Sequence, residues 1–417
     1  MGSTSHYPFG MRSKGRFIKG LLVALIFTLI PIQAFSAQKI TPGSTCKVLN
    51  QKVIYLKKTY TCMKSGKKLI WNKGVVIKPI PIPTPTAIGD PVGAIGGTPS
   101  PSLSPTPTGP ASKITLDNLD PVWTPLIAFK EVNERIVSFD SSKLNINYIV
   151  GPGVDPNRLL AEKAGIDRIA GLWSPYFKPE KVRFVYVSEN DSEWAEKIVV
   201  SEQLNSMMYQ SITLMITQNS CGFALGARPG GIYTNIQCLA TGQGLGNLQT
   251  GPHEYTHFFQ YSNNSLPDYS PCWITEGMAH FYGNAVGYSL QDPIGKERLN
   301  MFIGQTYNYD KGKGNPQNAR TLPKIMAEGS EEKISALFKA IETPGGGGSA
   351  SSCYLLGGLA FEALTATYGQ EKIAGFMTSF KASKDWKANF LSIFGIEIST
   401  FYQKLTPYLA YWGSKML

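Results

Sequence analysis

The sequence predicts an α+β protein: a small β-rich module, then a linker, then a larger domain that is mainly helical in its C-terminal half. Three observations support this. Residues 40–78 alternate apolar and basic side chains, as in "KVIYLKKTYTC", a pattern typical of half-exposed strands. Residues 79–112 are rich in Pro, Thr, Ser and Gly and cannot form a core. From residue 113 onward, helical and strand-like patterns alternate, and after about residue 250 nearly every segment has helical spacing.

The first 37 residues have the order of a secretory signal peptide. Basic residues between Arg12 and Lys19 precede the apolar run "GLLVALIFTLIPIQAFSA", which ends in small residues. The apolar core is short for a membrane span, although an uncleaved membrane anchor remains an alternative. We therefore expect a secreted or cell-envelope-associated, extracytoplasmic protein. Its expected parts are a signal peptide (1–37), a Lys-rich, Cys-containing β module (38–78), a linker (79–112) and the main domain (113–417).

The positive charge is confined to the front of the chain. The formal net charge is +11, yet residues 38–78 hold ten lysines and no acidic residue, whereas the region from Lys113 onward has 26 basic and 28 acidic residues. The main domain is therefore not expected to bind nucleic acid. The lysines of the module could contact anionic cell-envelope polymers or lipid headgroups, or they could simply be hydrated.

Six cysteines in an exported chain favour disulfides. Fifteen pairings are possible, and the spacing along the chain favours neighbouring partners. The resulting hypothesis pairs Cys46 with Cys62, Cys221 with Cys238, and Cys272 with Cys353.

Residues 113–250 contain both helix and strand patterns. Apolar residues recur at helical spacing in "DPNRLLAEKAGIDRIAGLWSPYF" and "DSEWAEKIVVSEQLNSMMY", which are predicted helices. "KVRFVYVS" and "GGIYTNIQC" are predicted strands. These patterns predict a mixture of helices and strands before the mainly helical half of the domain.

One short segment, "HEYTH" at residues 253–257, carries the strongest chemical signal. Positions i and i+4 share one face of a helix, so the imidazoles of His253 and His257 can point at one cation. Glu254 lies beside that pair, near the position of a metal-bound water. The pattern alone also occurs by chance in unrelated helices, where its members are ordinary polar residues.

The surroundings of this segment resemble a known family. "HEYTHFFQ…PCWITEGMAHFY" is similar to the gluzincin metallopeptidases, the thermolysin-like bacterial zinc peptidases of the MA type, and "YLLGGLAFEALTATYGQEKIAGFM" is similar to the helix that follows their site. The resemblance covers about residues 250–380. It implies a thermolysin-like zincin domain that binds Zn2+ and cleaves a peptide or protein substrate.

The resemblance assigns roles to individual residues. It implies that His253, His257 and Glu276 bind zinc, with 18 residues between His257 and Glu276, and that Glu254 is the general base for a zinc-activated water. Tyr354 is the candidate oxyanion donor, and a Cys272–Cys353 bridge would hold it near the metal. Alternatively, Glu276 is a surface carboxylate and Tyr354 is a packing aromatic.

The sequence differs from the thermolysin pattern at one position. Thermolysin has an Asp four residues after the ligand Glu, and this chain has His280 at that position. His280 could orient a ligand, replace one, or be an ordinary interior histidine. The orientation of His253 or His257 then needs a different carboxylate, for which Asp268 is a candidate, or a backbone carbonyl. The resemblance also implies an edge strand that pairs with the substrate, and "GGIYTNIQC" is the candidate for it.

The sequence therefore predicts a secreted zinc-dependent metallopeptidase. Two alternatives remain open at this stage. One is a non-catalytic cell-envelope binding protein on a metallopeptidase scaffold, and the other is a zinc hydrolase of cell-wall amide bonds.

Overall fold

The computed structural model describes residues 41–46, 52–55, 58–66, 68–76, 113–136, 144–202, 204, 224–228, 231–239, 248–265, 270–287, 293–342 and 350–417. The expected signal peptide and linker lie outside the described residues. The chain divides into two compact units, Met1–Leu103 and Ser104–Leu417. Each unit is described by itself.

The first unit contains a small antiparallel sheet. Its strands are β1 (Lys52–Tyr55), β2 (Lys58–Ser65), β3 (Lys68–Trp71) and β4 (Val75–Val76), and β2 pairs with each of the other three. A disulfide joins Cys46 to Cys62, as predicted, and the buried rings of Tyr60 and Trp71 pack around it. So small a core needs such a cross-link to be stable.

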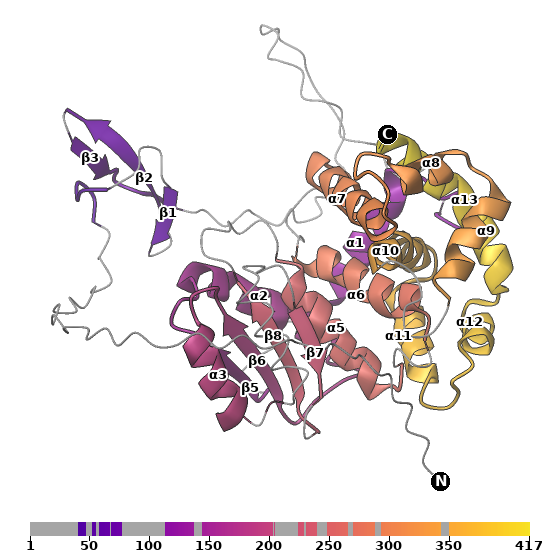
Figure 1. Cartoon of the computed structure of the whole chain (residues 1–417), viewed down its shortest axis with the longest axis horizontal. Helices are drawn as coiled ribbons and strands as arrows, with labels where there is room; N and C mark the ends of the chain where they lie inside the picture. The colour runs from indigo at the N-terminus through magenta and orange to yellow at the C-terminus, as the bar shows by residue number, and fades with distance from the viewer. Residues whose placement is uncertain are drawn as a thin grey trace, which may run out of the picture. The chain divides into compact units, whose positions relative to one another are not determined.

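The second unit contains a four-stranded mixed sheet (Figure 1). Its strands are β5 (Ile146–Val150), β6 (Val182–Val187), β7 (Ala224–Ala227) and β8 (Tyr233–Cys238), in the order β5-β6-β8-β7. β5, β6 and β8 run parallel, and β7 runs antiparallel to β8 at the edge.

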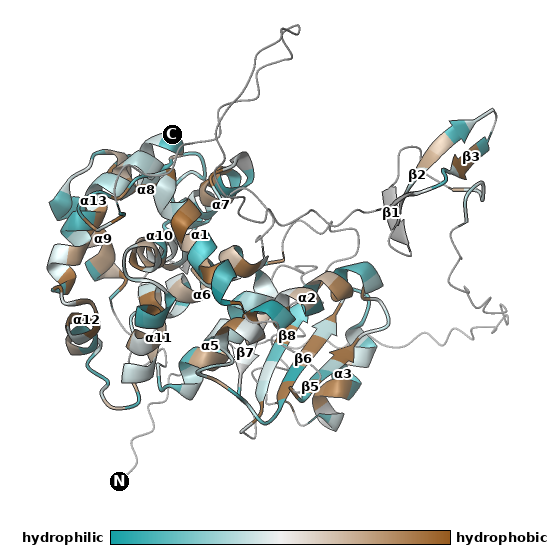
Figure 2. Cartoon of the chain, turned by 180° about the vertical axis from the view of Figure 1, so that it is seen from behind, coloured by the Kyte–Doolittle hydropathy of each residue, from teal (hydrophilic) through white to brown (hydrophobic). Residues whose placement is uncertain are grey.

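Helices cover both faces of this sheet, and this explains why β6 and β8 are fully buried. On one face, Phe184 packs with the aromatic core of α2 (Pro156–Trp173) and α5 (Thr250–Ser262). On the other face, Val185 and Val187 pack with α3 (Ser192–Ser201). Brown and teal turns occur together on α3 and α9 in Figure 2, as expected for helices with one buried face.

The rest of the unit is helical and lies beside the sheet-containing half (Figure 1). Its helices are α1 (Trp123–Arg135), α6 (Cys272–Gly287), α7 (Lys296–Gly312), α8 (Thr321–Ala327), α9 (Glu331–Ala340), α10 (Ala350–Tyr368), α11 (Gln370–Ser379), α12 (Trp386–Phe394) and α13 (Ile398–Lys415). Among the described residues, no helix is both long and apolar enough to cross a membrane.

The α+β class and the mainly helical C-terminal half are confirmed. The helix predicted in "DPNRLLAEKAGIDRIAGLWSPYF" is α2, and the strands predicted in "KVRFVYVS" and "GGIYTNIQC" are β6 and β8. The helix predicted in "DSEWAEKIVVSEQLNSMMY" is observed as α3 over Ser192–Ser201.

The prediction that "GGIYTNIQC" is the edge strand is wrong, because its strand β8 lies between β6 and β7. The edge strands of the described sheet are β5 and β7. β7 follows β6 in the chain, and its sequence "ALGA" has no alternation of large apolar and polar side chains that would mark it as a strand.

The disulfides agree with two of the three expected pairs. Cys272 is bonded to Cys353, and Cys46 to Cys62. Cys238 is also disulfide-bonded, and its expected partner Cys221 lies outside the described residues. Disulfides are typical of proteins that fold in an oxidising compartment, so these bonds are compatible with an extracytoplasmic protein.

Candidate metal centre

Helix α5 carries the "HEYTH" segment and is held firmly against α2. The two helices approach closely at Gly165 and Gly251, where a Cβ atom would come 3.2 Å from Pro252 and 3.0 Å from the Glu162 carboxylate, respectively. Farther along, Trp173 stacks on Phe259 with a centroid distance of 4.3 Å. These contacts fix the position of the helix that presents the two histidines.

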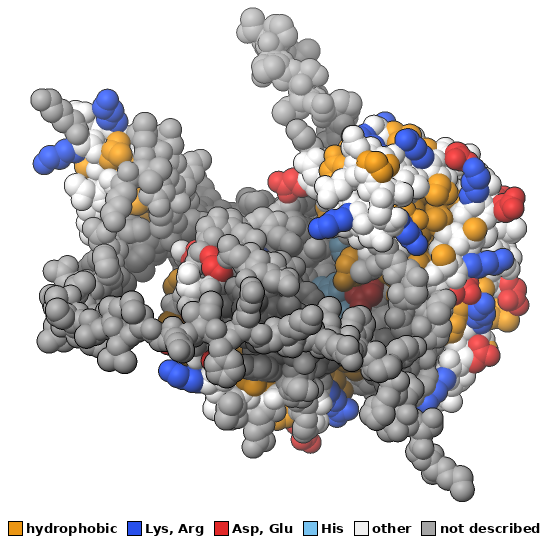
Figure 3. Space-filling model, viewed as in Figure 1, with side chains coloured by type: hydrophobic (Ala, Val, Ile, Leu, Met, Phe, Trp, Pro, Cys, Tyr) orange, Lys and Arg blue, Asp and Glu red, His pale blue; other side chains and the backbone are white. Residues whose placement is uncertain are grey.

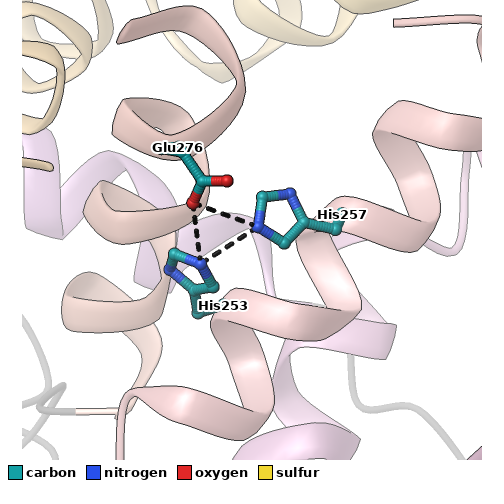
Figure 4. A group of neighbouring side chains, drawn as sticks. All are labelled: His253, His257 and Glu276. Carbon is teal, nitrogen blue, oxygen red and sulfur yellow. Dashed lines mark hydrogen bonds and ion pairs between the residues drawn. The ribbon is translucent and has the colours of Figure 1, made fainter. Parts of the chain in front are cut away.

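Three side chains from two helices converge on one point. His253 and His257 of α5 and Glu276 of α6 point toward one another (Figure 4). The two imidazole Nε2 atoms are 3.0 Å apart, and Oε2 of Glu276 is 3.4 Å from each of them. Two imidazoles and a carboxylate are donors that suit a divalent transition metal. The structure thus brings together the three residues that the sequence predicted as ligands.

The cluster lies at the surface of a hollow. His257 is buried, but the side chain of Glu276 is 30% exposed. Histidine and acidic side chains are visible in the hollow in Figure 3, and all the described histidines lie on α5 and α6. A ligand in solution can therefore reach the convergence point.

The charges of the cluster are strongly coupled. Burial alone would lower the pKa of His257, but the carboxylates of Glu276 and Glu254 outweigh it and raise the pKa to about 9. Burial alone would likewise raise the pKa of Glu276, but His257 and His253 hold it well below its usual value. The metal-free cluster therefore stores a proton on His257 that a cation would displace.

Helix α6 is set at the required distance by glycines and a disulfide. At Gly277, directly after Glu276, a Cβ atom would lie 2.4 Å from the backbone of Gly357 in α10. At Gly283, it would lie 2.8 Å from the carbonyl oxygen of Gln249, just before α5. The Cys272–Cys353 bond adds a covalent link between α6 and α10. Both contacts depend on glycine, and together they fix the position of Glu276.

Glu254 lies beside the cluster and against the edge strand. Its side chain is buried, and burial raises the pKa of its carboxyl group. Strand β7 comes close to it, because a Cβ atom at Gly226 would lie 2.8 Å from Glu254 Oε2. Gly226 thus leaves room for the carboxylate. Sequence reasoning missed this residue, because the contact joins segments that are far apart in the chain.

Tyr354 is located as the sequence predicted, next to the cluster. Its ring contacts that of His253 at a centroid distance of 5.7 Å, and its hydroxyl group is hydrogen-bonded to Glu276. Burial and the carboxylates of Glu276 and Glu254 raise the pKa of the phenol, so it keeps its proton. A second phenol, Tyr261, stacks on His257 with a centroid distance of 5.7 Å.

His280 does not belong to the ligand cluster. It is buried, its Nε2 atom lies 2.8 Å from the side-chain amide nitrogen of Gln305, and its ring stacks on that of Tyr354. Burial, followed by the effect of His253, lowers the pKa of His280 to about 3. The structure therefore supports the interpretation of His280 as an interior histidine.

His257 is oriented by a residue that the sequence did not indicate. Its Nδ1 atom lies 2.7 Å from Oε1 of Gln260. The expectation that a carboxylate or a backbone carbonyl does this is wrong for His257, because the partner is a side-chain amide. Asp268, the candidate carboxylate, lies outside the described residues.

A pocket of about 260 Å³ is lined in part by His280, whereas Tyr354 does not line it. Phe129, Phe281 and Phe302 supply apolar walls, and an ion pair between Arg298 and Glu362 closes one side. None of the three ligand residues lines it. The pocket is therefore separate from the convergence point of the histidines.

Comparisons with protein-family models, with curated proteins and with solved structures find no match to this chain.

Proposed function

We propose that this chain is a secreted zinc-dependent metallopeptidase with a thermolysin-like zincin domain. The observation that carries the proposal is the placement of a buried carboxylate, Glu254, between a three-ligand cluster and the edge strand β7. Ligands, general base and a strand edge for the substrate are then side by side.

The spacing of the ligand atoms supports zinc. A tetrahedral zinc ion with bonds of about 2.0–2.1 Å holds neighbouring ligand atoms roughly 3.3 Å apart. The three distances in the cluster are 3.0, 3.4 and 3.4 Å. Two imidazoles and one carboxylate are also a donor set of catalytic zinc sites, which keep a further position for water.

The residues around the cluster supply the remaining chemistry. A zinc ion held by His253, His257 and Glu276 would supply a water molecule with a pKa of about 7 and would polarise the substrate carbonyl group. Glu254, whose pKa is raised by burial, accepts the proton of the attacking water and delivers it to the leaving amine nitrogen. Tyr354, which keeps its proton, donates a hydrogen bond to the carbonyl oxygen as negative charge develops there.

The substrate of the proposed reaction is a peptide or protein in an extended conformation. Among the described strands, β7 has a neighbour only on its β8 side, so an extended chain can pair with its other edge. Pairing there places the peptide backbone beside Gly226, and therefore beside Glu254.

The test is hydrolysis of casein by the purified, zinc-loaded chain and by Glu254→Gln. We expect activity to fall about 10²- to 10⁴-fold while zinc content is unchanged, because the general base is lost and the ligands are kept. Glu371→Gln is the matched control, because that carboxylate is 70% exposed on α11 and should leave hydrolysis unaltered. Equal activity of Glu254→Gln and the parent chain would refute the proposal.

A second candidate is a zinc hydrolase of cell-wall amide bonds. It is favoured by the first unit, where Lys64, Lys68 and Lys73 are exposed and can contact an anionic cell envelope. Hydrolysis of purified cell wall but not of casein would select this candidate. Hydrolysis of neither substrate would instead favour a non-catalytic binding protein on the same scaffold.

A further inference from the structure

Gln260 makes two hydrogen bonds that join the two ligand helices. Its Oε1 atom lies 2.7 Å from Nδ1 of His257, and its Nε2 atom donates to the carbonyl oxygen of Thr275 at 2.9 Å. His257 is a ligand candidate of α5, and Thr275 directly precedes the ligand candidate Glu276 in α6. One amide therefore contacts both sources of metal ligands.

The chemistry of the Thr275 contact fixes the orientation of the amide. A backbone carbonyl oxygen can only accept a hydrogen bond, so the group facing it must be the NH₂ of Gln260. Its oxygen must then face His257, and a hydrogen bond there requires that Nδ1 of His257 carry the proton. The lone pair of the neutral imidazole is left on Nε2, which is the atom directed at the cluster.

Because all three residues are buried, the loss of either hydrogen bond is costly. Gln260 is completely buried, and His257 and Thr275 are only 4% and 2% exposed. Water cannot readily replace either bond, so loss of the amide leaves the Nδ1 donor of His257 without a partner and removes the contact of α5 with the Thr275 carbonyl of α6.

We propose that Gln260 is a positioning residue of the metal centre: it fixes the tautomer of His257 and the register of Glu276 at the same time. The inference rests on the proposed metal centre but not on peptidase activity. A neutral amide performs the task without adding a second negative charge beside the cluster. A carboxylate at this position could orient His257, but it would face the Thr275 carbonyl with an acceptor.

The two bonds can be separated by substitution. Gln260→Met keeps a side chain of similar length and removes both hydrogen bonds. Gln260→Glu keeps the acceptor for His257 and loses the donor to Thr275. Gln305→Met is the matched control, because Gln305 also hydrogen-bonds a buried histidine, His280, which lies outside the cluster, although there the amide NH₂ donates to the ring.

The experiment measures the dissociation constant of Zn2+ by competition with a chromophoric chelator, together with the melting temperature of each metal-free protein. We expect Gln260→Met to weaken zinc binding about 10- to 100-fold, the usual cost of losing a residue that orients a ligand. Gln260→Glu should bind zinc more tightly than Gln260→Met, since it retains the bond to His257. Gln305→Met should bind zinc like the parent chain.

Two results would overturn the proposal. One is zinc affinity of Gln260→Met within twofold of the parent value, even if its melting temperature falls, because Gln260 would then be structural only. The other is an equal loss of affinity in Gln305→Met and Gln260→Met, because the effect would then be general softening of the core. Both measurements hold whether or not the chain hydrolyses casein, so failure of the peptidase proposal remains distinguishable.

Discussion

Two buried histidines of the same domain each contact a glutamine, and only one of them belongs to the ligand cluster. Gln260 meets Nδ1 of His257 and leaves Nε2 directed at His253 and Glu276. Gln305 meets Nε2 of His280, so that nitrogen is occupied within the core. The comparison shows that residue type and burial do not identify a ligand. The decisive feature is which ring nitrogen the protein leaves unused.

The electrostatic surroundings of the two histidines differ in the same sense. His257 faces two carboxylates, which raise its pKa to about 9 despite burial. His280 has Tyr354 and Gln305 as close neighbours, and burial lowers its pKa to about 3. The carboxylates around His257 therefore favour a positive charge there, carried either by a proton or by a bound cation. The surroundings of His280 keep its ring neutral.

The largest expected effect comes from removing each ring in turn. His257→Ala should weaken Zn2+ binding on the order of 10³-fold, because a bound zinc contributes about 10–16 kcal/mol distributed over its ligands. His280→Ala should reduce stability while it changes zinc affinity by less than about tenfold, within the range expected of a residue that is not a ligand. Chelator competition checks both variants, and equal losses of affinity would erase the distinction between the two histidines.

Removing the Cys272–Cys353 disulfide tests the covalent link between α6, which carries Glu276 and His280, and α10, which carries Tyr354. Cys272→Ser with Cys353→Ser should lower the free energy of unfolding by about 2–4 kcal/mol, since the bond closes a long loop with a separation of 81 residues. Chemical denaturation followed by Trp fluorescence measures this. The double variant of Cys46 and Cys62 is the control and should leave this transition unchanged, because that pair lies in the other unit. An unaltered transition in the first double variant would contradict the structural role of the bond.

A smaller effect is expected from Gly226→Ala on β7. The added methyl group meets Oε2 of Glu254 at 2.8 Å and should displace the carboxylate, so casein hydrolysis should fall about 10- to 100-fold with zinc affinity retained. Gly304→Ala on α7 is the matched control, because no atom lies within 4 Å of its added Cβ. Hydrolysis by Gly226→Ala at the parent rate would show that Glu254 is not constrained by the edge strand.

The smallest single step is the change of zinc affinity per pH unit, which separates the two histidines. Below pH 9 the metal-free His257 carries a proton that zinc must displace, so zinc affinity should rise about tenfold per pH unit between pH 6 and 8. His280 adds nothing to this slope, since its pKa of about 3 keeps it neutral throughout. Chelator competition at pH 6, 7 and 8 measures the slope. A flat profile would contradict the protonated state of His257.

Local patterns in the sequence predicted much of this centre. His253 and His257 converge because helical geometry places positions i and i+4 on one face. "KVRFVYVS" forms a strand because its β-branched and aromatic residues suit a buried strand. The pairs Cys46–Cys62 and Cys272–Cys353 followed from spacing along the chain. Glu276 came from the family resemblance rather than from periodicity.

The remaining features depend on tertiary packing that no local pattern reveals. Gln260 stands three residues after His257, yet its role depends on the Thr275 carbonyl of another helix. Gly226 matters only because β7 lies against Glu254, and "ALGA" has no strand-like alternation. The contact of Gly277 with Gly357 likewise joins positions 80 residues apart, as their residue numbers show.

The most direct test of the account is a crystal structure of the zinc-soaked chain with diffraction data collected at the zinc absorption edge. One strong anomalous peak is expected about 2.0–2.2 Å from Nε2 of His253, Nε2 of His257 and a carboxylate oxygen of Glu276. A zinc ion bound elsewhere in the chain, or no peak between α5 and α6, would contradict it.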